Sequence, residues 1–471
     1  MTQITSAFNT LRAALTGPVL DPDDPGYDTA RGVWNADIDH RPAVIARCVC
    51  AADVAAAVTF SRREGLTVSV RGGGHHPSGA AVADGGMMIH LGGLNGVSVD
   101  PVARRARVGG GALLGDLDAA TQAYDLATTA GTVSHTGVGG LTLSGGLGWL
   151  GHRHGLALDN LVSAQVVTAE GRVLRTSRRE LPELFWALRG GGGNFGVVTE
   201  FEFRLHKVGP MVDFGLFFFG LDQGAEALRL GRELAATASR DTTVLIIALN
   251  APPAPFVPER HRFQPGFAVL ATSFGATGFG GTDEHSRLAA RIRESVPPLF
   301  EFVGPLPYLT LQRILDEAHP RGLRAYQDSL YLDELSDAAI TTLTERMRTK
   351  SSPLTTITMF PLDGAYQDVS DQDTAWGGSR SGYAVMMIGI APTPELFDAE
   401  RRWVRSLWRA LLPHTRGIGG YLNSVTELEE YRVRASYGPA TYERLARVKA
   451  SYDPENVFRH NANITPAQVL G

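Results

Sequence analysis

The residues with the clearest chemical potential lie in one short segment, Arg71-Gly72-Gly73-Gly74-His75-His76. Three successive glycines permit backbone conformations that other residues avoid, so their N–H groups can point outward as a nest for a phosphate group. A histidine at the end of such a loop can contact a cofactor that the loop carries. From the spacing alone, a histidine that only stabilises the turn is an equally good interpretation.

A second glycine-rich stretch, Gly146-Leu-Gly-Trp-Leu-Gly151, fits the dinucleotide pattern G-x-G-x-x-G. A Rossmann site, however, needs a buried strand before these glycines and a helix N-terminus after them. Residues 141–145 do not have the pattern of a buried strand, and residues 152–157 begin a helix poorly. We therefore reject the Rossmann interpretation. The sequence also has neither a Walker loop nor a Gly-x-Ser-x-Gly nucleophile motif.

The histidine and cysteine patterns do not predict a metal site. His152 and His154 supply two ligands, and no carboxylate or cysteine cluster nearby offers a third. We expect both histidines to lie at the surface or to form hydrogen bonds. Cys48 and Cys50 are the only cysteines, which is too few for a structural zinc site or a disulfide framework.

The elements that must position the glycine loops are short helices and strands, so the first 200 residues are predicted to be α+β. A helix over 51–64 has Val54, Ala57 and Val58 on one face. Strands are expected at 67–70, 87–91, 97–99, 106–108 and 196–205, a hairpin at 164–168 and 173–175, and a helix at 182–189. The glycines follow strand ends, where a backbone can approach a ligand closely.

After about Pro210 the glycines become fewer and longer apolar segments begin. Strands are predicted at 214–219, 244–249, 267–272, 356–360 and 383–390, and helices at 283–295, 336–349 and 394–412. These elements indicate a second α+β domain built on a sizeable sheet. The polar tail over 442–464 is expected to be a loop that docks on the rest of the protein.

Composition limits the partners. The chain has 471 residues, with 44 basic and 49 acidic side chains, so its net charge is −5. This mild acidity argues against nucleic acid as a partner. No apolar run reaches the roughly 18 residues that span a bilayer, and the N-terminus lacks a signal-peptide pattern. We expect a soluble, cytoplasmic protein of two or more domains, a monomer or a homodimer, that acts on a small molecule.

Six motifs in order then resemble one family. They are Val70 to His75, Thr136 to Gly140, Gly145-Gly146, Gly155 to Asn160, Glu183 to Gly196, and Tyr452 to Ile464. Together they resemble the berberine bridge enzyme-like branch of the vanillyl-alcohol-oxidase-type flavoproteins, over nearly the whole chain from Trp34 to Ile464. The pattern is most similar to a bacterial group that carries FAD on a single covalent bond and includes nicotine oxidases and favorskiiase-type monooxygenases.

The resemblance implies a fold and a cofactor site. It implies a two-domain PCMH-type FAD-binding fold, with an FAD domain over 1–208 (core about 38–208), a substrate domain over 209–430 made of a large antiparallel sheet covered by helices, and a returning segment over 431–471. His75 falls on the histidine that bonds to the 8α-methyl group of FAD. The other implied cofactor residues are Arg71, Gly72, Gly73, Gly74, His76, Gly137, Gly139, Gly140, Gly145, Gly146, Asn194, Gly196, Val198, Asn461 and Asn463.

Departures from the family pattern are equally informative. Many members attach FAD a second time through a cysteine, but that position is Val133 here. Thr136 stands at the position that gates oxygen, and its short side chain leaves room for O2. Thr136 and Leu141 match the favorskiiase-type pattern, so flavin-N5-oxide chemistry stays open. The glutamate base of that type aligns with Thr358, and a hydroxyl is a poor proton acceptor at neutral pH.

The proton acceptor is therefore open. Tyr421, with its neighbour Asn423, is the first candidate, because a positively polarised site can acidify a phenol. Tyr437 and Asp363 are weaker candidates, and His135 is expected to cap the glycine turn rather than to point at the flavin.

We expect an O2-using oxidase that takes hydride from an alcohol, phenol or amine, by preference an aromatic or polycyclic molecule, onto flavin N5. The alternatives are an N5-oxide monooxygenase, a dehydrogenase that excludes O2, and a flavin-binding protein without turnover.

Overall fold

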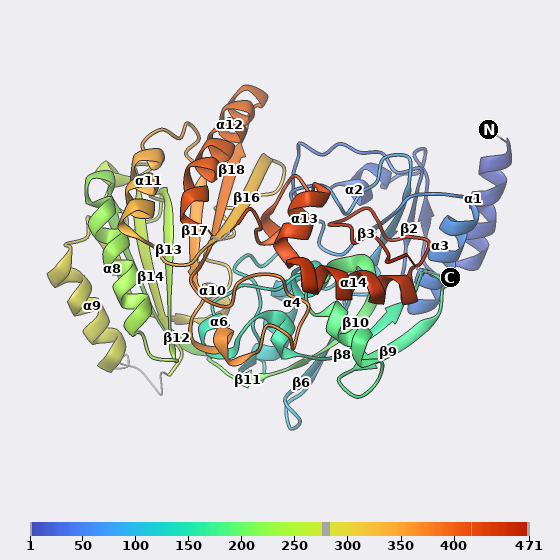
Figure 1. Cartoon of the computed structure of the whole chain (residues 1–471), viewed down its shortest axis with the longest axis horizontal. Coiled ribbons are helices and arrows are strands. Elements are labelled where there is room, and N and C mark those ends of the chain that lie inside the picture. The colour runs from blue at the N-terminus through green and yellow to red at the C-terminus, as the bar shows by residue number, and fades with distance from the viewer. Residues whose placement is uncertain (1, 276–282, 416, 469–471) are drawn as a thin grey trace.

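The computed structural model describes residues 2–275, 283–415 and 417–468. The chain forms two lobes, an N-terminal domain and a domain built on one large sheet (Figure 1). In the described part of the chain, no helix has both the length and the apolar character required to cross a membrane.

The N-terminal domain contains two sheets. The first has the order β1-β2-β4-β3, and β2, β4 and β3 are parallel. Its elements are β1 (Val19–Leu20), β2 (Val44–Arg47), β3 (Val68–Arg71) and β4 (Met87–His90), with helices α1 (Thr2–Ala14), α2 (Tyr27–Arg31) and α3 (Ala51–Arg63). Helix α3 buries Val54, Ala57 and Val58, as its spacing predicts. Strand β3 leads directly into the loop that carries His75.

The second sheet of this domain is antiparallel, in the order β5-β6-β10-β8-β9. Its strands are β5 (Val97–Asp100), β6 (Arg105–Gly109), β8 (Leu161–Val167), β9 (Val173–Ser177) and β10 (Val197–Arg204). The expected hairpin is confirmed, because β8 and β9 pair directly. Short elements connect these strands: α4 (Leu114–Gln122), β7 (Leu126–Ala127), α5 (Val138–Leu143), α6 (Gly151–His154), α7 (Pro182–Leu188) and β11 (His206–Lys207).

The second domain is a seven-stranded antiparallel sheet in the order β15-β12-β14-β13-β17-β18-β16. Its strands are β12 (Met211–Gly220), β13 (Thr242–Asn250), β14 (Pro265–Ser273), β15 (Phe300–Pro307), β16 (Arg324–Leu332), β17 (Thr356–Pro361) and β18 (Tyr383–Ala391). One face is covered by α8 (Gly224–Thr237), α9 (Asp283–Ser295), α11 (Asp337–Met347) and α12 (Pro394–Leu411), and the short helix α10 (Tyr308–Leu311) follows β15. The other face is turned toward the N-terminal domain (Figure 1).

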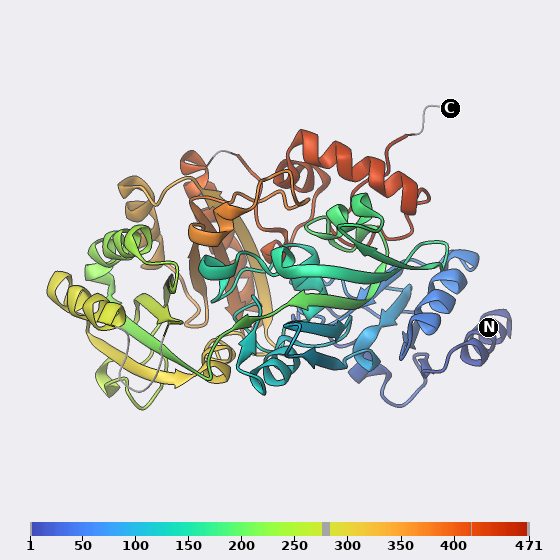
Figure 2. The same cartoon turned by 90° about the horizontal axis from the view of Figure 1, so that it is seen from below.

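The C-terminal part of the chain returns to the N-terminal domain as two helices, α13 (Glu430–Tyr437) and α14 (Pro439–Tyr452), which lie along it in Figure 2. The prediction of a loop from residue 442 is therefore wrong for its first part, since residues 442–452 are helical. The remainder is a docked loop. Lys449 is fully buried, and its Nζ donates to Asp453 Oδ2 (2.7 Å), Phe458 O (2.9 Å) and Asn194 O (2.8 Å). The division at residues 208 and 430 stays a prediction.

Candidate active site

A cavity of about 310 Å³ lies between the glycine loops of the N-terminal domain and the inner face of the sheet. Strands β16, β17 and β18, the segment 421–424 and, from the tail, Phe458, His460, Asn461 and Ala462 complete its wall. Among the described residues, no Asp, Glu, Lys or Arg side chain lines it. The titratable groups of the wall are His75, His76, His319, His460 and Tyr421. The cavity is thus suited to a large ligand whose reacting end is uncharged.

Two glycine loops form the floor of the cavity, and their backbones touch. A Cβ atom on Gly73 would lie 2.3 Å from the backbone nitrogen of Gly137, and one on Gly137 would lie 2.4 Å from that of Gly73. Only glycine permits this approach. Gly140 is different, because a Cβ there would meet nothing within 4 Å, and the residue lines the cavity. The loops therefore present bare backbone to whatever fills the space.

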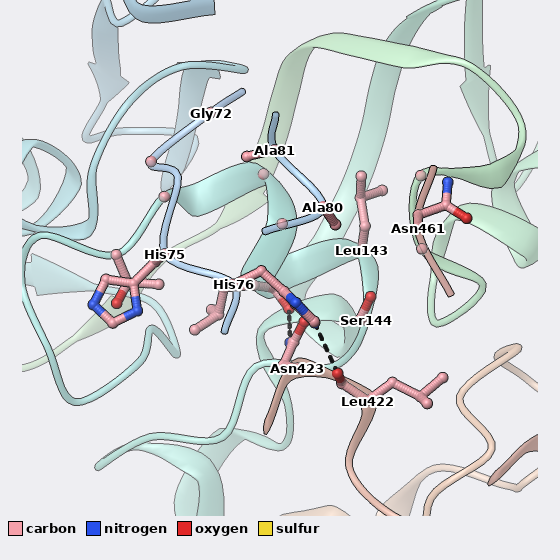
Figure 3. A pocket seen from close by; sticks show the side chains of 18 of the residues that line it. Gly72, His75, His76, Ala80, Ala81, Leu143, Ser144, Leu422, Asn423 and Asn461 are labelled. Carbon is pink, nitrogen blue, oxygen red and sulfur yellow. Dashed lines mark hydrogen bonds between the residues drawn. The ribbon is translucent and has the colours of Figure 1, made fainter. Parts of the chain in front are cut away.

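His75 lies in the wall at the end of the first loop (Figure 3). Its ring stacks on Trp34, with centroids 4.7 Å apart and planes at 16°, and a second ring, His135, lies 5.0 Å away at 33°. His75 Nε2 is buried and has no hydrogen-bond partner. Burial, with repulsion from Arg321 and from His135 and His319 when these are protonated, lowers the pKa of His75 well below its ordinary value. The imidazole is therefore neutral, with a nitrogen lone pair free to form a bond.

His135 does not cap the glycine turn, contrary to expectation. Its ring contacts His75, and its Nδ1 is buried without a partner. His152 and His154 were expected at the surface or in hydrogen bonds. His152 is buried, with its Nδ1 3.5 Å from Asp363 Oδ1, and the half-buried His154 stacks its ring on that of His206 at 3.6 Å. Throughout the described ranges, no cluster of three or more His, Cys, Asp or Glu side chains has the arrangement of a metal site.

Three side chains considered as proton acceptors either lie outside the cavity wall or form other hydrogen bonds. Asp363 pairs with His152 and lines a separate small cavity, so it does not face the main one. Thr358 is buried in β17 and is not part of the wall. Tyr437 donates a hydrogen bond to Gly190 O (3.1 Å), and burial raises its pKa. The structure therefore does not support Asp363 or Tyr437 as a catalytic base.

Tyr421 is in the wall, but its environment opposes ionisation. The hydroxyl oxygen accepts hydrogen bonds from Gly146 N (3.0 Å) and from Asn423 Nδ2 (2.9 Å), and Asn423 also donates to Leu141 O (3.2 Å). Burial outweighs these hydrogen bonds and raises the pKa of Tyr421. The structure therefore does not support Tyr421 as an acidified phenol. Tyr421 holds the neighbouring loop in place and stays protonated.

Most of the predicted site residues meet at this cavity. Those in its wall are Gly72, Gly73, Gly74, His75, His76, Thr136, Gly137, Gly139, Gly140, Asn194, Gly196, Val198, Tyr421, Asn423 and Asn461. The others lie behind it: a Cβ on Gly145 would meet the Tyr421 ring at 2.9 Å, and one on Gly146 would meet Ala157 at 2.3 Å. Arg71 also lies behind the loop, beside Gly74, and Asn463 lies outside the wall.

Two predicted cofactor residues also hold the wall together. His76 Nε2 lies 2.9 Å from Leu422 O, which fixes the segment 421–424 (Figure 3). Asn194 Nδ2 donates to Ala462 O (3.1 Å), and its Oδ1 accepts from Ile464 N (3.0 Å). The amide of Asn194 thus binds the tail, which completes one side of the cavity.

Sequence reasoning missed the residues that the sheet contributes. Gln327, Met386 and Ile388 line the cavity beside Phe360, whereas the predicted apolar strand over 244–249 does not. Gln327 Oε1 accepts from Ser424 Oγ (3.0 Å), and no hydrogen bond joins its amide nitrogen to another of the described residues. Gln327 lies on β16, which the apolar pattern did not reveal. No signal in the sequence alone would have placed it at the site.

The residues present fit FAD. The loops offer exposed backbone for a pyrophosphate, and two cations stand beside them: Arg71 bonds to His90 and to Gly32 O, and Arg321 to Gly73 O and His135 O. Neither guanidinium pairs with a carboxylate in the described part of the chain. Asn461 Oδ1 and His75 Nε2 are buried polar atoms without partners. Buried polar atoms normally have a hydrogen-bond partner, so a bound molecule is the natural source of the partner that these two atoms lack.

Comparison with known proteins agrees with this fit. Residues 42–177 match the family model of an FAD binding domain, and residues 420–465 match that of berberine and berberine-like proteins. The chain is 33% identical over 470 residues to (R)-6-hydroxynicotine oxidase of Paenarthrobacter nicotinovorans, with 96% of this chain and 97% of the relative covered. The chain belongs to the berberine bridge enzyme-like family of FAD-linked oxidoreductases.

Solved structures of the family have the same fold. 6-Hydroxy-D-nicotine oxidase from Arthrobacter nicotinovorans aligns with a TM-score of 0.82 and 31% identity, covering 96% of this chain and 98% of that one. A xylooligosaccharide oxidase from Myceliophthora thermophila C1 aligns with a TM-score of 0.84, covering 99% and 100%. At 21% identity the second likeness shows the fold alone. The expected PCMH-type α+β fold and the FAD cofactor are confirmed.

Proposed function

We propose that this protein is an oxidase that carries FAD on one covalent bond, through His75, and oxidises a neutral amine. The observation that carries the substrate class is the lack of a strong base: in the described part of the chain the cavity wall has no carboxylate, and its one phenol, Tyr421, has a raised pKa. The wall histidines other than His75 are His76, His319 and His460; each places a ring nitrogen on a backbone carbonyl, and burial lowers the pKa of each, which weakens it as a base. Hydride loss from an alcohol or phenol requires removal of the hydroxyl proton. Hydride loss from a neutral amine does not, so this wall favours the amine.

The single tether is supported by His75 and by Val133. The buried, neutral His75 presents Nε2 without a partner. Val133, which takes the place of the family's second attachment residue, lines the same cavity and has no nucleophilic atom. Bound FAD would supply two-electron chemistry, accepting hydride and passing the electrons to O2. Thr136 in the wall leaves room for O2.

The substrate end of the cavity has an apolar surface with one amide. Phe360, Met386 and Ile388 offer apolar contact, and the Gln327 amide, held at its oxygen by Ser424, offers N–H donors. A ligand with an aromatic body and a single acceptor matches this surface better than a sugar with hydroxyls on every side. The identity to a nicotine oxidase points in the same direction.

The tether is tested by precipitating the purified protein in acid. We expect the pellet to stay yellow, with the flavin on the peptide that contains His75. His75→Ala should release the flavin into the supernatant, and His76→Asn, one residue away, should retain it. Flavin that stays in the pellet of His75→Ala would contradict the tether.

The amine is tested by anaerobic reduction of the flavin with a series of amines of different basicity, with matched alcohols as controls. Because the described wall offers no carboxylate or acidified phenol as a base, the pH dependence of reduction should follow the pKa of each amine. Rapid reduction by alcohols, with one enzyme pKa common to all substrates, would overturn the proposal. Reoxidation in air then separates an oxidase from a dehydrogenase that excludes O2, and an oxygenated product would indicate the N5-oxide alternative. A cytoplasmic location and a monomeric or homodimeric state stay predictions.

A further inference from the structure

The surroundings of His75 come from both domains. Trp34, which stacks on His75, donates from its backbone to Gly74 O (2.8 Å) and from its indole to His319 O (3.0 Å). Asn35 then exchanges two hydrogen bonds with Ala325, at 2.8 and 2.9 Å. His319 lies in the segment that leads into β16 of the sheet domain, and Ala325 lies at the start of β16 itself. The ring that supports His75 is therefore fixed where the two domains meet.

Arg321, in the same segment, crosses to both glycine loops. Its Nη2 donates to Gly73 O (3.3 Å) and to His135 O (3.2 Å). Gly73 lies two residues before His75, and His135 places its ring against that of His75. The two loops also touch directly at Gly73 and Gly137. One side chain of the sheet domain thus connects both loops beside the proposed attachment point.

We propose that Arg321 and His135 form a clamp that holds the His75 imidazole for covalent attachment of FAD, so that attachment requires the docked sheet domain. The inference rests on the proposed tether. In the attachment reaction a nitrogen of His75 bonds to the 8α-carbon of FAD, and the imidazole loses its N–H proton while the methyl group loses one C–H. The two electrons of that C–H bond reduce the flavin and then pass to O2, which takes up two protons and becomes H2O2.

The charge of Arg321 serves this step because only a neutral imidazole can attack. The titratable or charged groups that face His75 are His135, His319 and Arg321, and Asp316 accepts hydrogen bonds from Ser134 beside them. Arg321, and His135 and His319 when they are protonated, add to burial in lowering the pKa of His75. Removing the charge of Arg321 raises that pKa, so that less of the imidazole is neutral at acid pH.

The experiment follows attachment itself. Full-length apoprotein from a riboflavin-starved host is mixed with FAD in aerated buffer, portions are precipitated in acid at intervals, and the flavin in the pellet is measured. Noncovalent binding is measured separately by quenching of FAD fluorescence. The variants are Arg321→Gln, Arg321→Lys, His135→Ala and His135→Phe. Arg324→Gln is the matched control, because it removes an ion pair with Asp37 between the same two segments without touching either loop.

We expect Arg321→Gln to bind FAD but to attach it more slowly at acid pH, by about tenfold for each pH unit that the rate profile moves toward alkaline pH. Arg321→Lys keeps the charge but not the two-carbonyl contact, so its profile stays in place while its rate falls at every pH. His135→Ala slows attachment, His135→Phe restores part of the rate by keeping a ring against His75, and Arg324→Gln matches the wild type.

The outcomes separate the clamp from the tether. Wild-type attachment rates in both Arg321→Lys and His135→Ala overturn the clamp, whether or not Arg321→Gln folds. An unshifted pH profile in a folded Arg321→Gln variant overturns the role of the charge. Wild-type protein that binds FAD but leaves its pellet colourless overturns the proposed tether instead, and with it the clamp.

Discussion

Replacing Asp118 with asparagine should stabilise the protein at alkaline pH. Asp118 lies on α4 of the N-terminal domain and is buried against α10 of the sheet domain. Its Oδ2 accepts a hydrogen bond from Gln312 Nε2 (3.0 Å), its Oδ1 has no partner, and no cation pairs with it among the described residues. Burial raises the pKa of Asp118 to about 7.

The magnitude follows from the difference between folded and unfolded chains. The ordinary pKa of an aspartate is 3.8, so the folded protein binds a proton at Asp118 over a range in which the unfolded chain has lost it. The stabilisation from this proton is fully present below about pH 4 and is lost as the pH rises through about 7. At about 1.4 kcal/mol per pH unit, the loss reaches about 4 kcal/mol. In the Asp118→Asn variant the side chain is neutral at every pH, so this loss of stability does not occur.

The assay is equilibrium urea unfolding of the holoprotein, followed by tryptophan fluorescence, at about pH 5 and about pH 8. The difference in unfolding free energy between Asp118→Asn and wild type should grow by about 2–3 kcal/mol between these values. Glu345→Gln, an exposed carboxyl on α11, is the control and should leave the pH dependence unchanged. Parallel pH curves for Asp118→Asn and wild type would refute the reasoning.

Three further outcomes are expected. Arg380→Gln should cost about 3–5 kcal/mol in the same urea assay, because it leaves Asp159 without its buried partner, which Arg380 contacts twice at 2.9 Å. Tyr421→Phe should lower kcat by less than about tenfold and leave the pH profile in place; a hundredfold loss would identify Tyr421 as a base after all. Thr136→Leu should slow flavin reoxidation by O2 in stopped flow without slowing reduction, and equal rates would remove Thr136 from the oxygen path.

How far the sequence predicts the fold depends on where a strand lies in its sheet. Central strands such as β13 and β18 are buried on both faces, so their sequences are apolar runs from which a strand can be predicted. Neither edge strand was predicted, and the reason differs between the two. β15 contains Pro305 and Pro307, which a sheet tolerates at its edge, and β16 carries Gln327, Asp328 and Ser329 at its centre. Most of helix α14 was mistaken for a loop because the segment that follows it, which contains Asn461 and Asn463, is rich in amide side chains.

The candidate site was predictable from the sequence where it depends on close contacts between backbone atoms. The loops at Gly73 and Gly137 must be glycine because main chain meets main chain, and that requirement is visible as glycine clusters in the sequence. Side-chain roles were not predictable in this way. Asp363 follows β17 closely, yet it faces His152 and not the cavity, and His135 lies against His75 because a different loop passes there. Such relations depend on tertiary contacts between distant segments.

The placement of charge explains how one cavity can hold an anionic cofactor and still prefer a neutral substrate. An unpaired ionised group in the wall would cost several kcal/mol in an apolar cavity. Instead, Arg71 and Arg321 stand one layer behind the glycine loops, where their terminal nitrogens form hydrogen bonds with carbonyl and imidazole groups. Because no carboxylate neutralises them among the described residues, their field extends into a region of low dielectric constant. It favours phosphates at the loops and opposes a cationic ligand, so the proposed amine substrate would have to enter, or react, in its uncharged form.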